Sequence, residues 1–175
     1  DLNELRSLPG RPTGLGVDNP NVGFIDPAWN EAADNRPSPS AVSAPLVSFD
    51  GVNNVNGVLP PDTNGDIGPN HYMQWVNLSF AIYNRAGTLL YGPAAGNTLW
   101  TGFSGVCATS NDGDPIVLYD QLADRWMVSQ FALPNYPNGP FYQCIAVSQT
   151  PDPTGAWYRY QFTVSSTKMN DYPHF

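Results

Sequence analysis

Four short apolar stretches follow one another between residues 114 and 164, and polar turn residues separate them. They cover residues 116–119, 125–131, 142–148 and 157–164. The last stretch alternates large apolar side chains with polar ones, as a strand with one covered face does. Strands joined by short connections pair antiparallel, because parallel strands need long crossovers. This region therefore predicts a four-stranded antiparallel meander whose most apolar strand comes first.

A second strand pattern precedes this meander. Residues 76–82 alternate large apolar side chains with small or polar ones, which predicts a single half-buried strand. Residues 84–87 (Asn-Arg-Ala-Gly) supply a hairpin turn, and residues 88–91 return as a strand. Residues 92–113 are rich in Gly, Ser, Thr and Asn and predict long loops. The chain therefore belongs to the all-β class.

The composition excludes several other classes of protein. Asp, Asn, Gly and Pro make up 64 of the 175 residues, and these residues favour turns over helices, so helical bundles and coiled coils are excluded. The formal charge is −8 with only 7 Lys and Arg, which disfavours binding to nucleic acid or to anionic membranes. No run of 18 apolar residues exists, so no transmembrane helix is predicted.

Residues 1–45 differ from the rest of the chain. They contain seven prolines and little periodicity, which predicts an extended N-terminal arm or linker. The β pattern occupies residues 46–175. Low Lys content, abundant Asn, Thr, Tyr and Trp, and long polar loops are typical of a secreted or extracellular β protein. The sequence therefore predicts two parts, and it predicts an extracellular location.

Two cysteines, Cys107 and Cys144, are the only ones in the chain. Their spacing excludes the C-x-x-C motifs of redox and zinc sites. They are either two buried free thiols or one disulfide, and the extracellular composition favours the disulfide.

A weak internal repeat suggests how the strands are organised. Asp66, Asp114 and Asp171 each lie in an Asp-rich turn ahead of a strand or at the end of the chain, with spacings of 48 and 57 residues. Such spacings suit the blades of a β-propeller, in which each blade is a four-stranded meander. A β-sandwich with Asp-rich turns is the alternative. Residues 46–175 would supply about two blades and the start of a third.

A partial propeller needs completion by other blades. A propeller closes with about four to eight blades, and two blades alone leave part of their core exposed. We therefore expect the remaining blades to come from the same precursor or from another chain. The chain ends at Phe175, where a further strand is expected to begin, which indicates truncation or cutting.

Two long motifs carry a resemblance to known proteins. Residues 60–72 (PPDTNGDIGPNHY) and 111–126 (NDGDPIVLYDQLADRW) resemble a family of large secreted, mostly uncharacterised bacterial proteins that look propeller-like. The resemblance covers residues 46–175. It implies secretion and a propeller, and it carries no activity over to this chain.

The Asp-rich turns contain the candidate metal ligands. Asp62, Asn64 and Asp66 place side-chain oxygens at alternating positions around Gly65, an arrangement that calcium prefers. Asp112 and Asp114 form a second, shorter cluster. Calcium at one or both clusters is one interpretation. The other is that these side chains cap turns by accepting backbone N–H groups.

Two functions follow from these features. The first is an extracellular module that binds a partner or builds a larger surface assembly, since no complete catalytic set is present. The second is part of a secreted hydrolase of carbohydrate, with Asp66, Asp114 and Asp171 as acids at the mouth of the propeller channel. The aromatic side chains either fill the core or include a platform for stacking sugars; they are Trp75, Trp100, Trp126, Trp157, Tyr136, Tyr142 and Tyr158.

Overall fold

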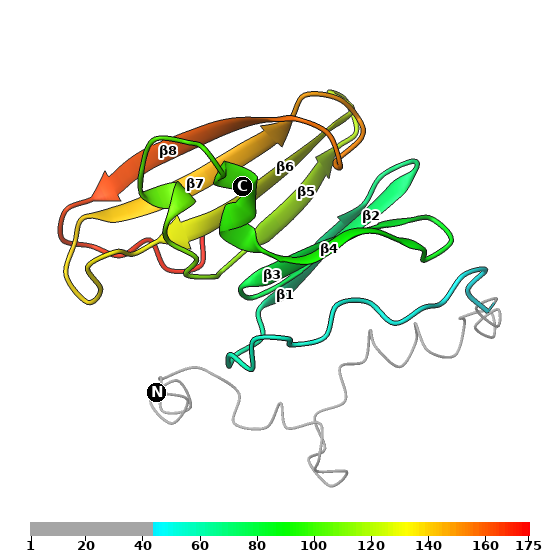
Figure 1. Ribbon diagram of the computed structural model, residues 1–175, viewed down its shortest axis with the longest axis horizontal. Coiled ribbons are helices and arrows are strands. Elements are labelled where there is room, and N and C mark those ends of the chain that lie inside the picture. The colour runs from blue at the N-terminus through cyan, green and yellow to red at the C-terminus, as the bar shows by residue number, and fades with distance from the viewer. Residues whose placement is uncertain (1–43) are drawn as a thin grey trace, which may run out of the picture. The chain divides into compact units, whose positions relative to one another are not determined.

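Two four-stranded antiparallel sheets make up the fold in the computed structural model, which describes residues 44–175 (Figure 1). The first sheet contains β1 (Thr63–Ile67), β2 (His71–Val76), β3 (Ser79–Asn84) and β4 (Leu89–Ala95) in chain order. The second contains β5 (Ile116–Asp120), β6 (Arg125–Ala132), β7 (Phe141–Ser148) and β8 (Trp157–Ser165), also in chain order. The predicted all-β class with antiparallel four-stranded meanders is confirmed.

The second sheet follows the sequence pattern closely. All four predicted strands are present, and Asp120 begins the tight β5–β6 turn by accepting the backbone N–H groups of Leu122 and Ala123 at 2.8 and 3.0 Å. An aspartate at this position satisfies turn donors that no strand can reach. The hairpin turn after β3 is also confirmed, since Asn84 accepts the N–H groups of Ala86 and Thr88 at 2.9 Å.

The first sheet differs from the prediction in two places. The single strand expected over residues 76–82 is wrong, because the chain turns at Asn77 and Leu78 and separates β2 from β3. Asn77 adopts a positive φ of 45°, which asparagine tolerates better than most residues. Residues 63–67, expected as a turn, form β1, and residues 92–113 contain the end of β4 and two 3₁₀ helices, η1 (Gly96–Trp100) and η2 (Val106–Ala108).

The main core lies between the two sheets. Alternate residues of β2, β3, β6 and β7 point into it together with Val117 of β5, and η1 and η2 cover it with Trp100 and Cys107. Its buried members are Met73, Trp75, Phe80, Ile82, Trp100, Cys107, Val117, Trp126, Val128, Ala132, Cys144 and Ala146. Trp75, Trp100 and Trp126 are therefore core residues. For these three, the structure agrees with the interpretation that the aromatic side chains fill the core.

The outer faces of the two sheets differ in how far they are covered by other residues. Phe49 packs on Tyr72 and Tyr83 of the first sheet, with ring centroids 5.9 and 5.2 Å apart, and Val52 is buried beside them. On the second sheet, every second residue of β8 is apolar and about half exposed. We call this set the β8 apolar face; it consists of Tyr158, Tyr160, Phe162 and Val164, exposed by 54%, 45%, 50% and 48%.

The remaining large-scale predictions concern other parts of the chain or a larger assembly. The extended arm predicted for residues 1–45 lies almost entirely outside the described residues. Within residues 44–175, no helix has the length and apolarity that a membrane crossing requires. Two sheets are described, and the closed propeller stays a prediction.

Candidate functional site

Polar side chains of β1 join the two sheets at their first strands. The Asn64 Oδ1 atom accepts the backbone N–H of Val117 at 2.8 Å, and Asp66 Oδ2 accepts that of Tyr119 at 2.7 Å. Residues 64 and 66 project from the same face of β1, because successive strand residues alternate. They therefore satisfy two β5 donors, and Asp66 Oδ1 also accepts the N–H of Ile67 at 2.7 Å.

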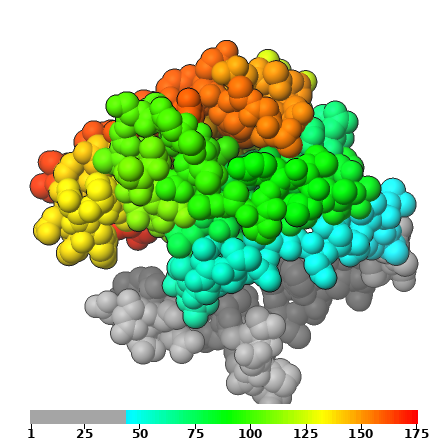
Figure 2. Space-filling view, viewed as in Figure 1, coloured from blue at the N-terminus to red at the C-terminus, as the bar shows by residue number. Residues whose placement is uncertain are grey.

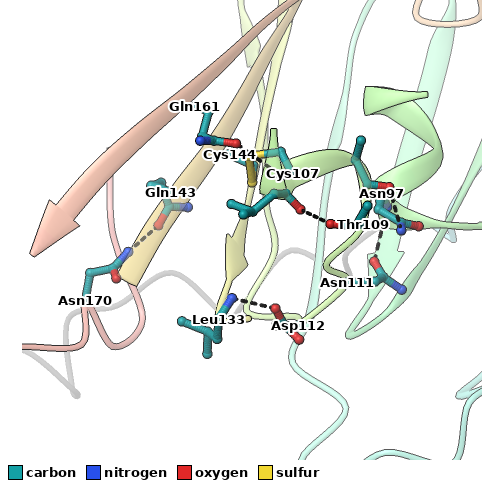
Figure 3. Close-up of a disulfide and its surroundings, with 12 residues drawn as sticks. Asn97, Cys107, Thr109, Asn111, Asp112, Leu133, Gln143, Cys144, Gln161 and Asn170 are labelled. Atoms are coloured by element: carbon teal, nitrogen blue, oxygen red, sulfur yellow. Dashed lines mark hydrogen bonds between the residues drawn. A yellow bond between two sulfur atoms is a disulfide. The ribbon is translucent and has the colours of Figure 1, made fainter. Parts of the chain in front are cut away.

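The other predicted metal ligands have protein donors as well. Asp62 Oδ2 accepts the Asn77 amide at 2.9 Å, and Asp112 Oδ2 accepts the backbone N–H of Leu133 at 2.6 Å (Figure 3). Within residues 44–175, no three His, Cys, Asp or Glu side chains are grouped as a metal ion requires. The engaged oxygens fit the capping interpretation better than a calcium loop. Calcium binding stays a prediction.

Three carboxylates gather where the first strands of the sheets begin. The pKa of Asp114 is raised above its ordinary value of 3.8, mainly because burial disfavours the charge. The like charges of Asp62 and Asp171 raise it further, and the backbone N–H of Tyr172 opposes them by donating to the carboxylate. Asp114 thus holds a proton more readily than an exposed aspartate does.

The structural repeat is offset from the one that the sequence indicated. Asp62 and Asp114 both have a positive φ, 42° and 47°, and each comes just before the first strand of its sheet. Asp66 was expected to match Asp114, but it lies inside β1. The structure thus associates Asp114 with Asp62 and Asp171, two carboxylates that act on its pKa, whereas Asp66 is used by β5. A catalytic role for Asp66, Asp114 and Asp171 stays a prediction.

Replacing Asp114 by asparagine is expected to stabilise the protein at pH 7. A carboxyl whose folded-state pKa is raised contributes stability below its ordinary pKa, and that contribution is lost as the pH rises through the folded value. Asn keeps an oxygen for Tyr172 and tolerates the positive φ. We expect a gain of about 0.5 kcal/mol, because Asp114 is only half-buried. Denaturant unfolding at pH 7 and pH 3 measures it; an equal gain at pH 3 would show that charge is not the cause.

A disulfide joins Cys107 of η2 to Cys144 of β7 (Figure 3). Both cysteines are fully buried, and the free-thiol alternative is excluded in this structure. Gln161 of β8 supports the bridge, since its Oε1 accepts the backbone N–H of Cys107 at 3.2 Å. The bridge fixes the polypeptide between the two sheets onto the second sheet.

A contact between a histidine and a carboxylate links the sheets at another point. The Nε2 atom of His71 in β2 lies 3.6 Å from Asp152, which belongs to the β7–β8 turn. The pKa of Asp152 is lowered, first because the Thr154 hydroxyl and backbone N–H donate to it and then by His71. His71 thus has a structural partner in the second sheet's β7–β8 turn.

A cavity of about 400 Å³ lies between η1, the first sheet and β8. Figure 2 shows the segment around η1 (green) beside the β7–β8 turn and β8 (orange). Tyr91, Trp157 and Arg159 line the cavity, together with Thr98, Thr101 and Thr154. Sequence reasoning missed it, because its walls come from segments about 60 residues apart. The alternation along β8 was the one available signal, since it places Trp157 and Arg159 on the same face.

The resemblance of residues 46–175 to secreted propeller-like proteins stays a prediction. No family model matches the chain, and no curated protein or solved structure matches it either.

Proposed function

We propose that residues 46–175 are a binding or structural module of a larger extracellular β-propeller. In this proposal the two sheets are neighbouring blades, and a further four-stranded antiparallel sheet covers the second one. The carrying observation is the β8 apolar face, which is the outward side of the second sheet. Contiguous exposed apolar surface on a folded protein marks a site of contact with another protein surface.

The packing between the first two sheets supports this occupant. There, alternate apolar residues of one sheet meet those of the next and form the main core. The opposite side of the second sheet is arranged in a similar way. Tyr160 lies beside Ile145 of β7, and Phe162 lies beside Gln143. No charged side chain belongs to the β8 apolar face. Such a surface suits another β-sheet and is a poor match for a charged partner.

The path of the chain after β8 supports it as well. Asn111 precedes β5 and donates its amide to the Leu78 carbonyl of the first sheet at 3.0 Å. Asn170 follows β8 and donates its amide to Gln143 Oε1 of the second sheet at 2.6 Å (Figure 3). Tyr172 has a positive φ of 43°, like Asp114 before β5. The segment after β8 therefore repeats features of the connection that introduced the second sheet.

The disulfide supports the extracellular location. Disulfides form and persist in oxidising compartments and are rare in the cytosol. Cys107 and Cys144 are the only cysteines, and both are used in the bridge. This covalent link therefore agrees with the composition in favouring secretion.

A photo-activatable side chain at Phe162 tests the proposed assembly in the native particle. We expect benzoylphenylalanine at this position to cross-link to a β-rich segment, because a third sheet would cover it. The same group at Leu122, fully exposed on the β5–β6 turn, is the control and should give no such product. Mass analysis of the product tells whether the covering segment belongs to the same precursor or to another chain. A Phe162 variant that cross-links no more than the Leu122 variant would contradict the proposal.

A further inference from the structure

The cavity between η1 and β8 has the size of a ligand site and is open to solvent on one side. Its volume of about 400 Å³ lies within the range of roughly 300–1,000 Å³ that small-molecule sites occupy. It opens between the two sheets, on the side of β8 opposite to the β8 apolar face. An occupant here would not compete with a sheet that covers that face. Ligand binding in this cavity is therefore a property separate from the proposed module.

A guanidinium supplies the only charge in the cavity wall. Arg159 donates one N–H to the Thr101 carbonyl at 2.6 Å, and four of its five N–H donors remain for other acceptors. No Asp or Glu lines the cavity, and no carboxylate within residues 44–175 lies within ion-pair distance of Arg159. A half-buried guanidinium without a counter-ion is a binding point for a carboxylate, which it can hold through two parallel hydrogen bonds.

The hydroxyl groups of the wall present acceptors. Thr98 donates its proton to the Ala95 carbonyl at 2.6 Å, and Thr101 donates to the Thr98 carbonyl at 2.8 Å. Thr154 donates to Asp152 at 2.7 Å. Because each proton is used inside the protein, the lone pairs of these oxygens remain for donors on a ligand. Hydroxyl groups of a ligand would supply such donors.

Aromatic surface completes the wall. The indole of Trp157 is held by its N–H, which donates to the Pro153 carbonyl at 3.1 Å. The ring of Tyr91 stacks on Phe80 at 5.6 Å and remains 43% exposed. Rigid rings in a cavity with polar groups bind ligands that have one apolar and one polar side. The C–H face of a sugar ring is such a surface.

We propose that this cavity binds a uronic acid. The sugar carboxylate binds Arg159, the sugar hydroxyls donate to the threonine oxygens, and the ring lies against Trp157 or Tyr91. Each of the three chemical features of a uronic acid thus has a matching group in the wall. A neutral sugar leaves the guanidinium without its acceptor, and a simple carboxylate leaves the rings and hydroxyls unused.

Titration of the ¹⁵N-labelled full chain by NMR tests the proposal, with D-galacturonate as the probe and D-galactose as its neutral counterpart. We expect galacturonate to shift the Trp157 indole signal saturably and to bind about tenfold more tightly than galactose, as one charge-assisted hydrogen-bond pair provides. Acetate should bind more weakly than galacturonate. Equal affinity for galacturonate and galactose, or for galacturonate and acetate, would overturn the proposal.

Variants of two arginines locate the binding site. Arg159→Gln is expected to lose the preference for galacturonate, whereas Arg125→Gln, at the start of β6 and outside the cavity wall, should keep it. Salt provides a second measurement on the unmodified chain, which stays decisive if Arg159→Gln fails to fold. Raising the ionic strength should weaken galacturonate binding and leave galactose binding unchanged. Unchanged galacturonate binding in a folded Arg159→Gln variant, or at high salt, would overturn the role of Arg159.

Discussion

Replacing Cys107 and Cys144 together by alanine is expected to lower the free energy of unfolding by about 4 kcal/mol. The two cysteines are 37 residues apart, and a bridge across a loop of this length removes that much chain entropy from the unfolded state. The loop includes η2, β5 and β6, so the link also holds the connection between the sheets against β7. Urea unfolding of the two proteins, compared at equal pH, measures the difference.

Reduction of the unmodified protein is the control for this prediction. Reducing agent should bring its unfolding midpoint close to that of the double alanine variant and should leave the variant itself unchanged. A thiol assay on denatured protein should find no free thiol before reduction and two after it. A double variant within 1 kcal/mol of the unmodified protein would contradict the prediction.

Replacing Trp126 by alanine is expected to cost about 3–5 kcal/mol of folding stability, the usual range for a fully buried tryptophan. Trp126 is 0% exposed and packs on Tyr119 at 5.1 Å between ring centroids. Its indole N–H donates to the Pro151 carbonyl at 3.1 Å, and its ring lies against Gly68 of the β1–β2 turn, where an added Cβ would be only 3.0 Å from the ring. The substitution therefore opens a cavity between the sheets and leaves the Pro151 carbonyl without this donor.

Two further variants separate these contributions. Trp126→Phe keeps much of the ring and loses the N–H, so its cost should be clearly smaller than that of Trp126→Ala. Leu122→Ala removes a fully exposed leucine and should leave the unfolding midpoint unchanged. Chemical unfolding followed by tyrosine fluorescence and circular dichroism measures all three. A loss below 1 kcal/mol for Trp126→Ala would contradict the central position of this residue.

The second sheet could be predicted strand by strand, because each of its turns interrupts the apolar pattern. Asp120 and the Pro-rich stretch before Trp157 mark such interruptions plainly. In the first sheet the turn at Asn77 and Leu78 preserves the alternation, so the pattern reads as one strand. The asparagine, which tolerates positive φ, was the only local signal. β1 was missed because Thr63–Ile67 is polar and contains Gly65.

The candidate sites were predictable only in part. The Asp-rich turns are evident in the sequence. Whether Asp66 binds a metal ion or a backbone N–H, however, depends on β5, which begins 50 residues later in the chain. The sequence pattern groups Asp114 and Asp171 with Asp66, yet the third carboxylate that acts on Asp114 is Asp62. Arg159 gains its significance from η1 and Tyr91, whose proximity arises from packing of the two sheets. Local sequence patterns carry no information of that range.

The bridge from Asn64 and Asp66 to β5 also bears on aggregation. β1 and β5 are edge strands, and an exposed edge can recruit a strand from another molecule. At this junction the side chains of Asn64 and Asp66 occupy N–H groups of Val117 and Tyr119 that an incoming strand would need. β4 and β8 are edge strands too, and both carry exposed apolar side chains. Intermolecular pairing of the isolated chain is therefore expected at β4 and β8, whereas the junction of β1 with β5 is protected.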